Sequence, residues 1–230
     1  MSSTKCNLSV IGLPFSTFTR TITLALHYHQ IRFIQQSCRP HSDLANAHHP
    51  LGFVPTLIDH NPSNDNGKDF EVWESQAIAR YLDSSYLKWP GHDVSNKFTN
   101  AKVDMMINLA SNHVFPAVEH GVVKVRLALE EQGKTDKDIV DAVAEGISKL
   151  KKIFSVVETF LCQQDGRWVI GQSLTWADFF LYPPLADLKA VSEGIVLNDF
   201  PRLKTWMDEM EGLDACKKTY EGTLANERWQ

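Results

Sequence analysis

Residues 51–59 read Leu-Gly-Phe-Val-Pro-Thr-Leu-Ile-Asp, and residues 70–82 read Phe-Glu-Val-Trp-Glu-Ser-Gln-Ala-Ile-Ala-Arg-Tyr-Leu. The first stretch predicts a strand entered through Val54-Pro55, because proline cannot donate to a strand ladder and suits a strand's first residue. An X-Pro bond can be cis in a tight turn, and we expect a cis bond here. Residues 70–73 predict a short return strand. Ser75 then begins a helix whose apolar positions recur at helical spacing: Ile78, Tyr81 and Leu82.

The start of this helix suits a zwitterionic ligand. Backbone N–H groups at a free helix N-terminus, together with Ser75, can bind a carboxylate, and Glu74 can bind an ammonium group. The backbone of Val54, beside a proline, can pair edge-on with a peptide-like ligand. Without a ligand, the same pattern is a strand–loop–helix unit in which Ser75 caps the helix.

Two motifs in this region resemble the glutathione-binding half of soluble glutathione S-transferases: Val54-Pro55-Thr56-Leu57, followed by Glu74-Ser75-Gln76-Ala77-Ile78. The resemblance implies that glutathione is a co-substrate. His41 falls where the family places a basic residue for the glycine carboxylate, although a solvated loop histidine fits equally well. The implied glutathione-binding residues are His41, Phe53, Val54, Pro55, Glu74 and Ser75.

Phe53 departs from the family pattern. Many relatives carry glutamine just before Val-Pro, where its side chain hydrogen-bonds the tripeptide. Phenylalanine cannot donate, so that contact is lost, and glutathione is expected to bind more weakly or to lie differently.

The preceding residues predict a strand at 8–12, a helix at 16–30 and a strand at 31–36. A strand–helix–strand unit of this length implies parallel pairing. With the later hairpin and helix it gives a βαβ–ββα pattern, which matches the thioredoxin-like domain of the family. We therefore predict an α/β thioredoxin-like domain at 1–86, a linker at 87–95 and an all-α domain at 96–230.

The turn from Leu13 to Arg20 joins the first strand to the first helix. Its order of residues resembles the Pro-x-Ser-x-x-x-Arg turn of serine-type transferases, such as the phi and theta classes, and this resemblance makes Ser16 the catalytic residue. A free thiol with a pKa near ~8.5 is mostly protonated at neutral pH, so a hydroxyl donor at a helix N-terminus would favour the reactive thiolate. Ser16 can also be a simple helix cap, and Thr17 or Thr19 can be the donor instead.

The second half predicts helices. Apolar residues from Ile139 to Leu161 step by three and four, which indicates a core helix. Thr175 and Asp178 form a capping box, which the family carries at the start of a buried helix, so the resemblance extends through this half. Pro116 is expected to bend or end one helix, and Pro183-Pro184 to kink or end another.

Composition narrows the function. The 23 basic and 28 acidic residues give a net charge of −5 without a clustered basic run, which argues against nucleic acid. The polar residues 1–7 lack the apolar core expected of a signal peptide, and no apolar run approaches the roughly 20 residues of a membrane helix. Four scattered cysteines argue against disulfides and zinc and for a cytoplasmic location, and the histidine spacings do not indicate a metal site.

The leading expectation is a glutathione S-transferase acting as a homodimer on apolar electrophiles, with a role in detoxification. Its electrophile pocket is expected between the domains, lined by Phe15, Met106, Ala110, His113 and Phe115. One alternative is a glutathione-dependent isomerase, lyase or dehydratase of a single biosynthetic or catabolic pathway. Another is a non-catalytic ligand-binding or assembly module, as in elongation-factor gamma subunits.

Overall fold

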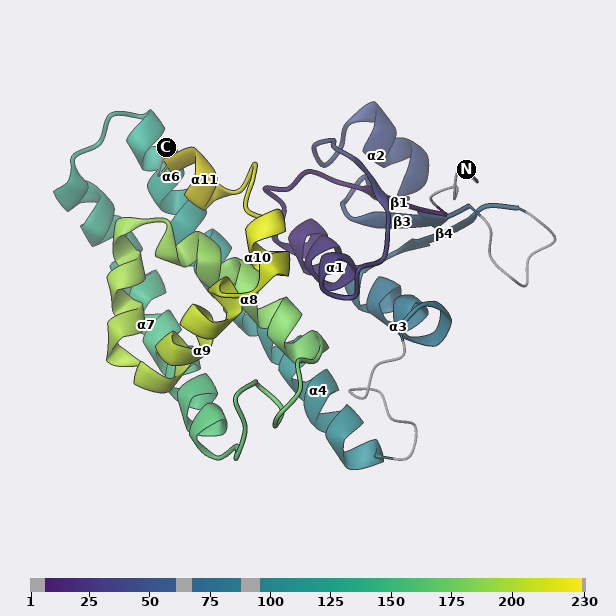
Figure 1. Ribbon diagram of the computed structural model, residues 1–230. Coiled ribbons are helices and arrows are strands. Elements are labelled where there is room, and N and C mark those ends of the chain that lie inside the picture. Colours follow the sequence, from purple (N-terminus) through teal and green to yellow (C-terminus); the bar gives the residue numbers. More distant parts are fainter. Residues whose placement is uncertain (1–6, 61–67, 88–95, 229–230) are drawn as a thin grey trace. The chain divides into compact units, whose positions relative to one another are not determined.

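Four strands form one mixed sheet in the order β2-β1-β3-β4 (Figure 1). The strands are β1 (Leu8–Ile11), β2 (Ile34–Gln36), β3 (Thr56–Asp59) and β4 (Phe70–Trp73). β1 pairs in parallel with β2, and the other pairings are antiparallel. The computed structural model describes residues 7–60, 68–87 and 96–228.

Helices cover both faces of this sheet (Figure 1). One face is covered by α1 (Thr17–Tyr28) and α3 (Ser75–Ser85), and the other face is covered by α2 (Asp43–His48). Asp59 marks the first face, because it accepts hydrogen bonds from Tyr81 of α3 at 2.6 Å and from Tyr86 at 2.5 Å. Burial and its own bond to the Asp59 carboxylate raise the pKa of Tyr81 to about 12. The order β1-α1-β2-α2-β3-β4-α3 confirms the predicted βαβ–ββα pattern.

The chain divides into two compact units, and each unit is built from two separate segments of the sequence. The first unit contains the chain up to Trp89 together with Asp214–Thr223, and the second contains Pro90–Leu213 and Leu224–Gln230. Apart from Leu87, the expected linker lies outside the described residues. Residues 214–223 were expected in the helical domain, whereas here they group with the sheet, where α10 (Asp214–Lys218) packs on α1.

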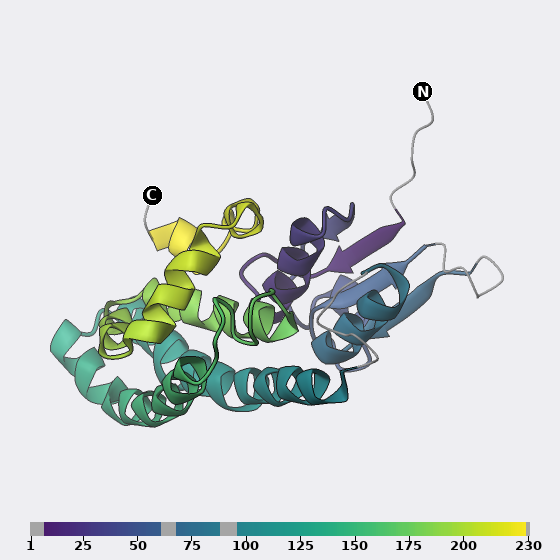
Figure 2. The same cartoon turned by 60° about the horizontal axis from the view of Figure 1, so that its bottom comes forward.

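The second unit is helical, as predicted. A run of helix without interruption extends from Lys97 to Glu131 (Figure 2). It contains α4 (Lys97–Leu109), the π-helix η2 (Ala110–Val114), α5 (Phe115–Val118), the π-helix η3 (Glu119–Val123) and α6 (Lys124–Glu131). The remaining helices are α7 (Asp136–Cys162), α8 (Trp176–Lys189), the 3₁₀ helix η4 (Ser192–Asp199), α9 (Pro201–Glu211) and α11 (Leu224–Arg228).

The helices continue through these prolines, so of the predicted alternatives an end is excluded, and a bend at Pro116 and a kink at Pro183-Pro184 stay predictions. Pro116 lies within the 97–131 run as the second residue of α5, next to Phe115, whose N–H bonds to the Ala110 carbonyl five residues back. This wider turn accommodates a residue that has no N–H to give. Pro183 and Pro184 lie inside α8, which is buried from Trp176 to Leu188, so packing holds the helix where local hydrogen bonding is weakened.

The predicted capping box of α8 is confirmed. The Thr175 N–H donates to Asp178 Oδ2 at 2.8 Å, and the other carboxylate oxygen of Asp178 accepts from the Val169 N–H and from Trp206 Nε1. Asp178 is fully buried. These bonds tie the start of α8 to the preceding loop and to α9. Asp178 is therefore a structural residue of the second unit.

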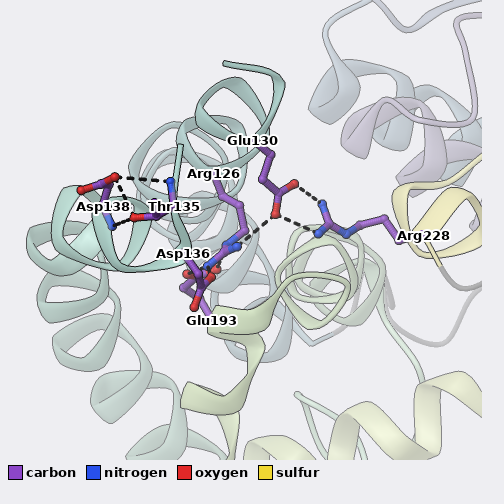
Figure 3. Close-up of polar contacts among 7 residues, drawn as sticks. All are labelled: Arg126, Glu130, Thr135, Asp136, Asp138, Glu193 and Arg228. Carbon is purple, nitrogen blue, oxygen red and sulfur yellow. Dashed lines mark hydrogen bonds and ion pairs between the residues drawn. The ribbon is translucent and has the colours of Figure 1, made fainter. Parts of the chain in front are cut away.

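A buried arginine organises the other end of this unit (Figure 3). Arg126 of α6 donates to both carboxylate oxygens of Glu193, at 2.5 and 2.6 Å, and also to Glu130 and Asp136. Glu130 lies between Arg126 and Arg228, and Arg228 donates to it at 2.8 and 3.0 Å. The C-terminal helix α11 is thus attached to α6 through charge-assisted hydrogen bonds. The two arginines lower the pKa of Glu130 to about 2.

Candidate functional site

Three loops meet at one edge of the sheet. Ile11 ends β1 and pairs with Thr56, which begins β3, and Thr56 pairs with Trp73, which ends β4. The segments that follow Ile11, precede Thr56 and follow Trp73 therefore emerge side by side. Neighbouring strands are about 4.8 Å apart, so the outer two segments are roughly 10 Å apart, which is close to the length of an extended tripeptide. This edge carries the predicted residues Ser16, Val54, Pro55, Glu74 and Ser75.

Ser16 is the N-cap of α1. Its Oγ accepts a hydrogen bond from the Thr19 N–H at 3.4 Å, and its own N–H donates to the Leu13 carbonyl at 3.0 Å. The side chain is half-buried. Accepting the cap bond uses an oxygen lone pair and leaves the hydroxyl hydrogen to donate elsewhere. The first turn of α1 contains no acidic residue, so the positive end of its dipole is not offset locally.

The two neighbouring threonines are less suited to contact a ligand. Thr17 is 6% exposed and Thr19 is 0% exposed. Thr19 Oγ1 lies toward Gly12, where an added Cβ would come within 2.3 Å of it. These positions favour Ser16 among the three candidate donors.

Val54 and Pro55 enter β3 through a cis peptide bond, as predicted. Pro55 is buried and Val54 is half-buried. A Cβ built on Gly12 would lie 3.2 Å from the Val54 Cβ, so the backbone after β1 passes close to the Val54 side chain. The segment that leads into the Ser16 turn therefore lies directly beside Val54.

Glu74 occupies a left-handed backbone conformation, with φ 69°, directly before α3. A non-glycine residue in such a conformation costs about 1–3 kcal/mol and persists only where its surroundings hold it. The turn changes strand into helix at a single residue and leaves the carboxylate outside the helix, with the Glu74 side chain 63% exposed. Ser75 is the first residue of α3 and is half-buried. A carboxylate and a helix N-terminus thus lie next to each other, as a zwitterion requires.

Aromatic rings fill the space between His41 and Glu74. His41 also has a left-handed backbone, with φ 62°, and its ring contacts Phe53 edge-on at 5.2 Å. Phe53 also contacts His49, whose ring packs on Trp73, with centroids 5.7 and 5.3 Å apart. Phe53 therefore packs between two histidines instead of presenting an amide to a ligand.

Four of the five predicted pocket residues belong to the second unit. Met106 and Ala110 are each 1% exposed and form part of its core, whereas His113 is exposed and Phe115 is half-buried. Phe115 packs edge-on against His120 at 5.7 Å. Phe15, in the first unit, is half-buried beside Ser16. Their role in an electrophile pocket stays a prediction.

Histidine–carboxylate pairs along the α2 face were missed by sequence reasoning. His60 contacts Ser9 through Nε2 and Asp69 through Nδ1, both at 2.8 Å, and His48 contacts Glu71 at 2.9 Å. The Ser9–His60–Asp69 order matches a hydrolytic triad, but Ser9 is only 2% exposed within β1, so a substrate carbonyl cannot reach it. The contacts link β1 to the β3–β4 hairpin.

Among residues 7–60, 68–87 and 96–228, no three or more His, Cys, Asp or Glu side chains lie close enough to hold a metal ion. Within the same part of the chain, no helix combines the length and the apolar character that crossing a membrane requires.

Two family models match the chain. The model of the glutathione S-transferase N-terminal domain matches residues 15–85, and that of the glutathione S-transferase C-terminal domain matches residues 124–220. The first match includes Ser16 and the Glu74–Ser75 turn, and the second includes the capping box of α8.

Similar proteins cover most of the chain. Glutathione S-transferase 1 of Manduca sexta is 29% identical over 173 residues, which are 74% of this chain and 69% of that protein. Glutathione S-transferase F6 of Arabidopsis thaliana is 24% identical over 221 residues, 92% of this chain and 98% of that protein. The crystal structure of glutathione transferase F7 from Populus trichocarpa has the same fold, with a TM-score of 0.74 at 23% identity, covering 94% of this chain and 98% of that one.

Proposed function

The chain belongs to the glutathione S-transferase family and is a glutathione transferase, and on this basis we propose that it conjugates the glutathione thiolate to apolar electrophiles. The observation that carries this proposal is the sheet edge at which the Ser16 hydroxyl, the Val54 backbone and the Glu74–Ser75 turn emerge side by side. Its roughly 10 Å span suits a tripeptide whose thiol lies in the middle.

Each end of glutathione has a partner in this arrangement. Glu74 receives the ammonium group of the γ-glutamyl end, and Ser75 with the N-terminus of α3 receives its carboxylate. The backbone of Val54 pairs with the cysteinyl residue. His41 binds the glycine carboxylate, and the loss of an amide at Phe53 weakens the contacts to this half of the ligand.

Ser16 then determines the chemistry. Its O–H donates to the glutathione sulfur, and with the N-terminus of α1 it favours the thiolate, whose proton leaves to solvent. The thiolate forms a carbon–sulfur bond with the electrophile while the leaving group departs with the bonding electron pair. A cysteine at this position could form a mixed disulfide with glutathione, whereas serine cannot.

The remaining proposals concern assembly and location. We propose a homodimer, because large apolar side chains are exposed in both units: Leu51, Trp73, Phe98 and Met105, with 43–75% of their surface accessible. The proposed location is the cytoplasm. Light scattering of the purified protein tests the dimer, and a monomer at micromolar concentration would contradict it.

Retention on immobilised glutathione and conjugation of a simple aryl halide test the proposed function. The wild type should be retained and should release halide in proportion to glutathione consumed. A Glu74→Ala, Ser75→Ala variant should lose at least about tenfold in glutathione affinity, since truncating each partner costs about 1–3 kcal/mol. Glu71→Ala is the matched control, because Glu71 lies in β4 shortly before Glu74 and contacts His48 instead. Equal retention of the wild type and the double variant would exclude this site.

The isomerase, lyase or dehydratase alternative keeps the same site, and the aromatic packing of Phe53 is the observation that favours it. In that case glutathione is regenerated. Turnover of a substrate without loss of free thiol therefore distinguishes it from conjugation.

A further inference from the structure

His49 is a buried histidine next to the proposed glutathione site. It follows α2, and its side chain is 2% exposed. His49 Nδ1 accepts a hydrogen bond from the Leu51 N–H at 3.0 Å, within a turn in which the Gly52 N–H bonds to the His49 carbonyl. An acceptor nitrogen carries no proton, so the ring proton of His49 is on Nε2.

Nε2 faces Glu74. The distance from His49 Nε2 to Glu74 Oε1 is 3.8 Å, about 1 Å longer than an N–H···O hydrogen bond. The His49 ring is fixed by Trp73 and Phe53, whereas the Glu74 side chain is 63% exposed and can move. A small movement of Glu74 brings its carboxylate into hydrogen-bonding distance of a donor that is already in place. Contacts of this kind are often long without a ligand and shorten when the complex forms.

We propose that His49 is a positioning residue for Glu74: its Nε2–H holds the Glu74 carboxylate in the orientation that receives the ligand's ammonium group. This inference rests on the proposed function. A neutral N–H donor orients a carboxylate without neutralising its negative charge. A lysine or arginine at the same place would form an ion pair with Glu74 and would compete with the ligand's ammonium group. His49 therefore acts through Glu74 and favours ligands that carry a free α-amino-acid end.

Two substitutions of His49 distinguish its hydrogen bond within the Leu51 turn from its proposed role in positioning Glu74. Asparagine at position 49 keeps an acceptor near the Nδ1 position, and so keeps the bond from Leu51, but its side chain is too short to reach Glu74. Glutamine places its amide nitrogen near the Nε2 position, and so keeps the donor to Glu74 but not the turn acceptor. If His49 only stabilises the turn, asparagine is the better replacement, and if it positions Glu74, glutamine is.

The test compares glutathione with its des-amino analogue, glutaryl-cysteinyl-glycine, by calorimetry on the full chain. The wild type should bind glutathione more tightly than the analogue. In His49→Asn that preference should fall by about tenfold, through weaker binding of glutathione with little change for the analogue. His49→Gln should retain most of the preference. His48→Asn is the matched control, because His48 contacts Glu71, and it should behave as the wild type.

The outcomes separate this inference from the proposed function. If the wild type does not prefer glutathione over the analogue, the ammonium-binding role of Glu74 is wrong and the role of His49 fails with it, whereas conjugation itself is tested by retention and aryl halide turnover. If the wild type has the preference and His49→Asn keeps it, only the role of His49 is overturned. Should His49→Asn fail to fold, His49→Gln decides, since loss of the preference in that variant contradicts a positioning role for the amide donor.

Discussion

The Ser16 hydroxyl can cap a helix and stabilise a thiolate at the same time, because the two tasks use different parts of the group. Its oxygen accepts from the Thr19 N–H, and its hydrogen remains available to donate. Glu74 likewise combines two roles: its strained backbone turns the chain from β4 into α3, and its side chain is free to meet a ligand. At this scale the proposed chemistry depends on a few side chains held by local backbone geometry.

Ser16→Ala should raise the pKa of the bound glutathione thiol and shift the pH–rate profile to higher pH. One hydrogen bond to a charged group contributes about 1.5–3 kcal/mol, so the conjugation rate at neutral pH should fall roughly ten- to a hundredfold. Glutathione affinity should change much less, since other residues hold the ends of the tripeptide. Thiol absorbance titration and initial rates measure these effects. An unchanged rate and an unchanged pH–rate profile would show that Ser16 is not the donor and would leave Thr17 or Thr19 as the candidates.

At the scale of elements, α8 shows how a buried carboxylate can organise a helix without taking part in catalysis. Burial raises the pKa of Asp178 to about 6, although the N–H and O–H donors around it act in the opposite direction. Between about pH 4 and 6 the folded chain therefore keeps a proton that the unfolded chain has lost. The contribution of Asp178 to the free energy of unfolding should be greatest below this range and should decrease as the pH rises through 6.

Asp178→Asn removes this titration and provides the test. The difference in free energy of unfolding between wild type and variant should decrease by up to about 3 kcal/mol from pH 4 to pH 7, measured by urea denaturation. Glu130 makes the opposite contribution: because its pKa is lowered in the folded chain, it stabilises the fold at pH values above its unfolded pKa, and this stabilisation is lost in acid. Glu130 is present in both proteins, so its contribution cancels in the difference between wild type and variant. Asp178→Asn should also leave the KM for glutathione unchanged, because Asp178 lies in the other unit. A difference that does not vary with pH would contradict the raised pKa.

Elements with local signals were predictable from sequence, and elements decided by packing were not. Val54-Pro55 and Glu74-Ser75 carry their turn geometry in their own residue types, so the sheet edge could be anticipated. Pro116 predicted a bend or an end, and the helix does not end there, because the π-helical turn before it accommodates the missing N–H. The His49–Glu74 contact depends on how α2 packs beside β4, and no local pattern records that.

At the scale of the whole molecule, a late segment supports the early turn that carries Ser16. Residues 214–223 belong to the first unit, and Gly222 lies against Pro14. Gly222 has φ +74°, and a Cβ added there would lie 3.2 and 3.3 Å from Pro14 Cβ and Cγ. A five-residue helix such as α10 has too few residues to show a periodicity, so the sequence placed this segment with the helical domain.

Gly222→Ala should lower both stability and activity. The left-handed backbone penalises alanine by about 1–2 kcal/mol, and the contact with Pro14 displaces the turn before Ser16. Gly133→Ala is the matched control, because Gly133 has φ +69° but nothing within 4 Å of an added Cβ. Thermal unfolding should show a loss in both variants, whereas kcat should fall only for Gly222→Ala. Equal kcat values in the two variants would show that the Pro14 contact does not affect catalysis.

The return of residues 214–223 to the first unit also has a consequence for how the protein is made. The sheet and α1 emerge from the ribosome early, but the segment that packs on α1 is synthesised more than a hundred residues later. At usual translation speeds this delay is on the order of ten seconds, during which that surface of α1 lacks its partner. Slower translation would lengthen this interval, so the exposure of that surface of α1 is set by the time needed to synthesise the intervening residues. A gene fragment that encodes only the sheet domain would produce a protein with that surface permanently uncovered.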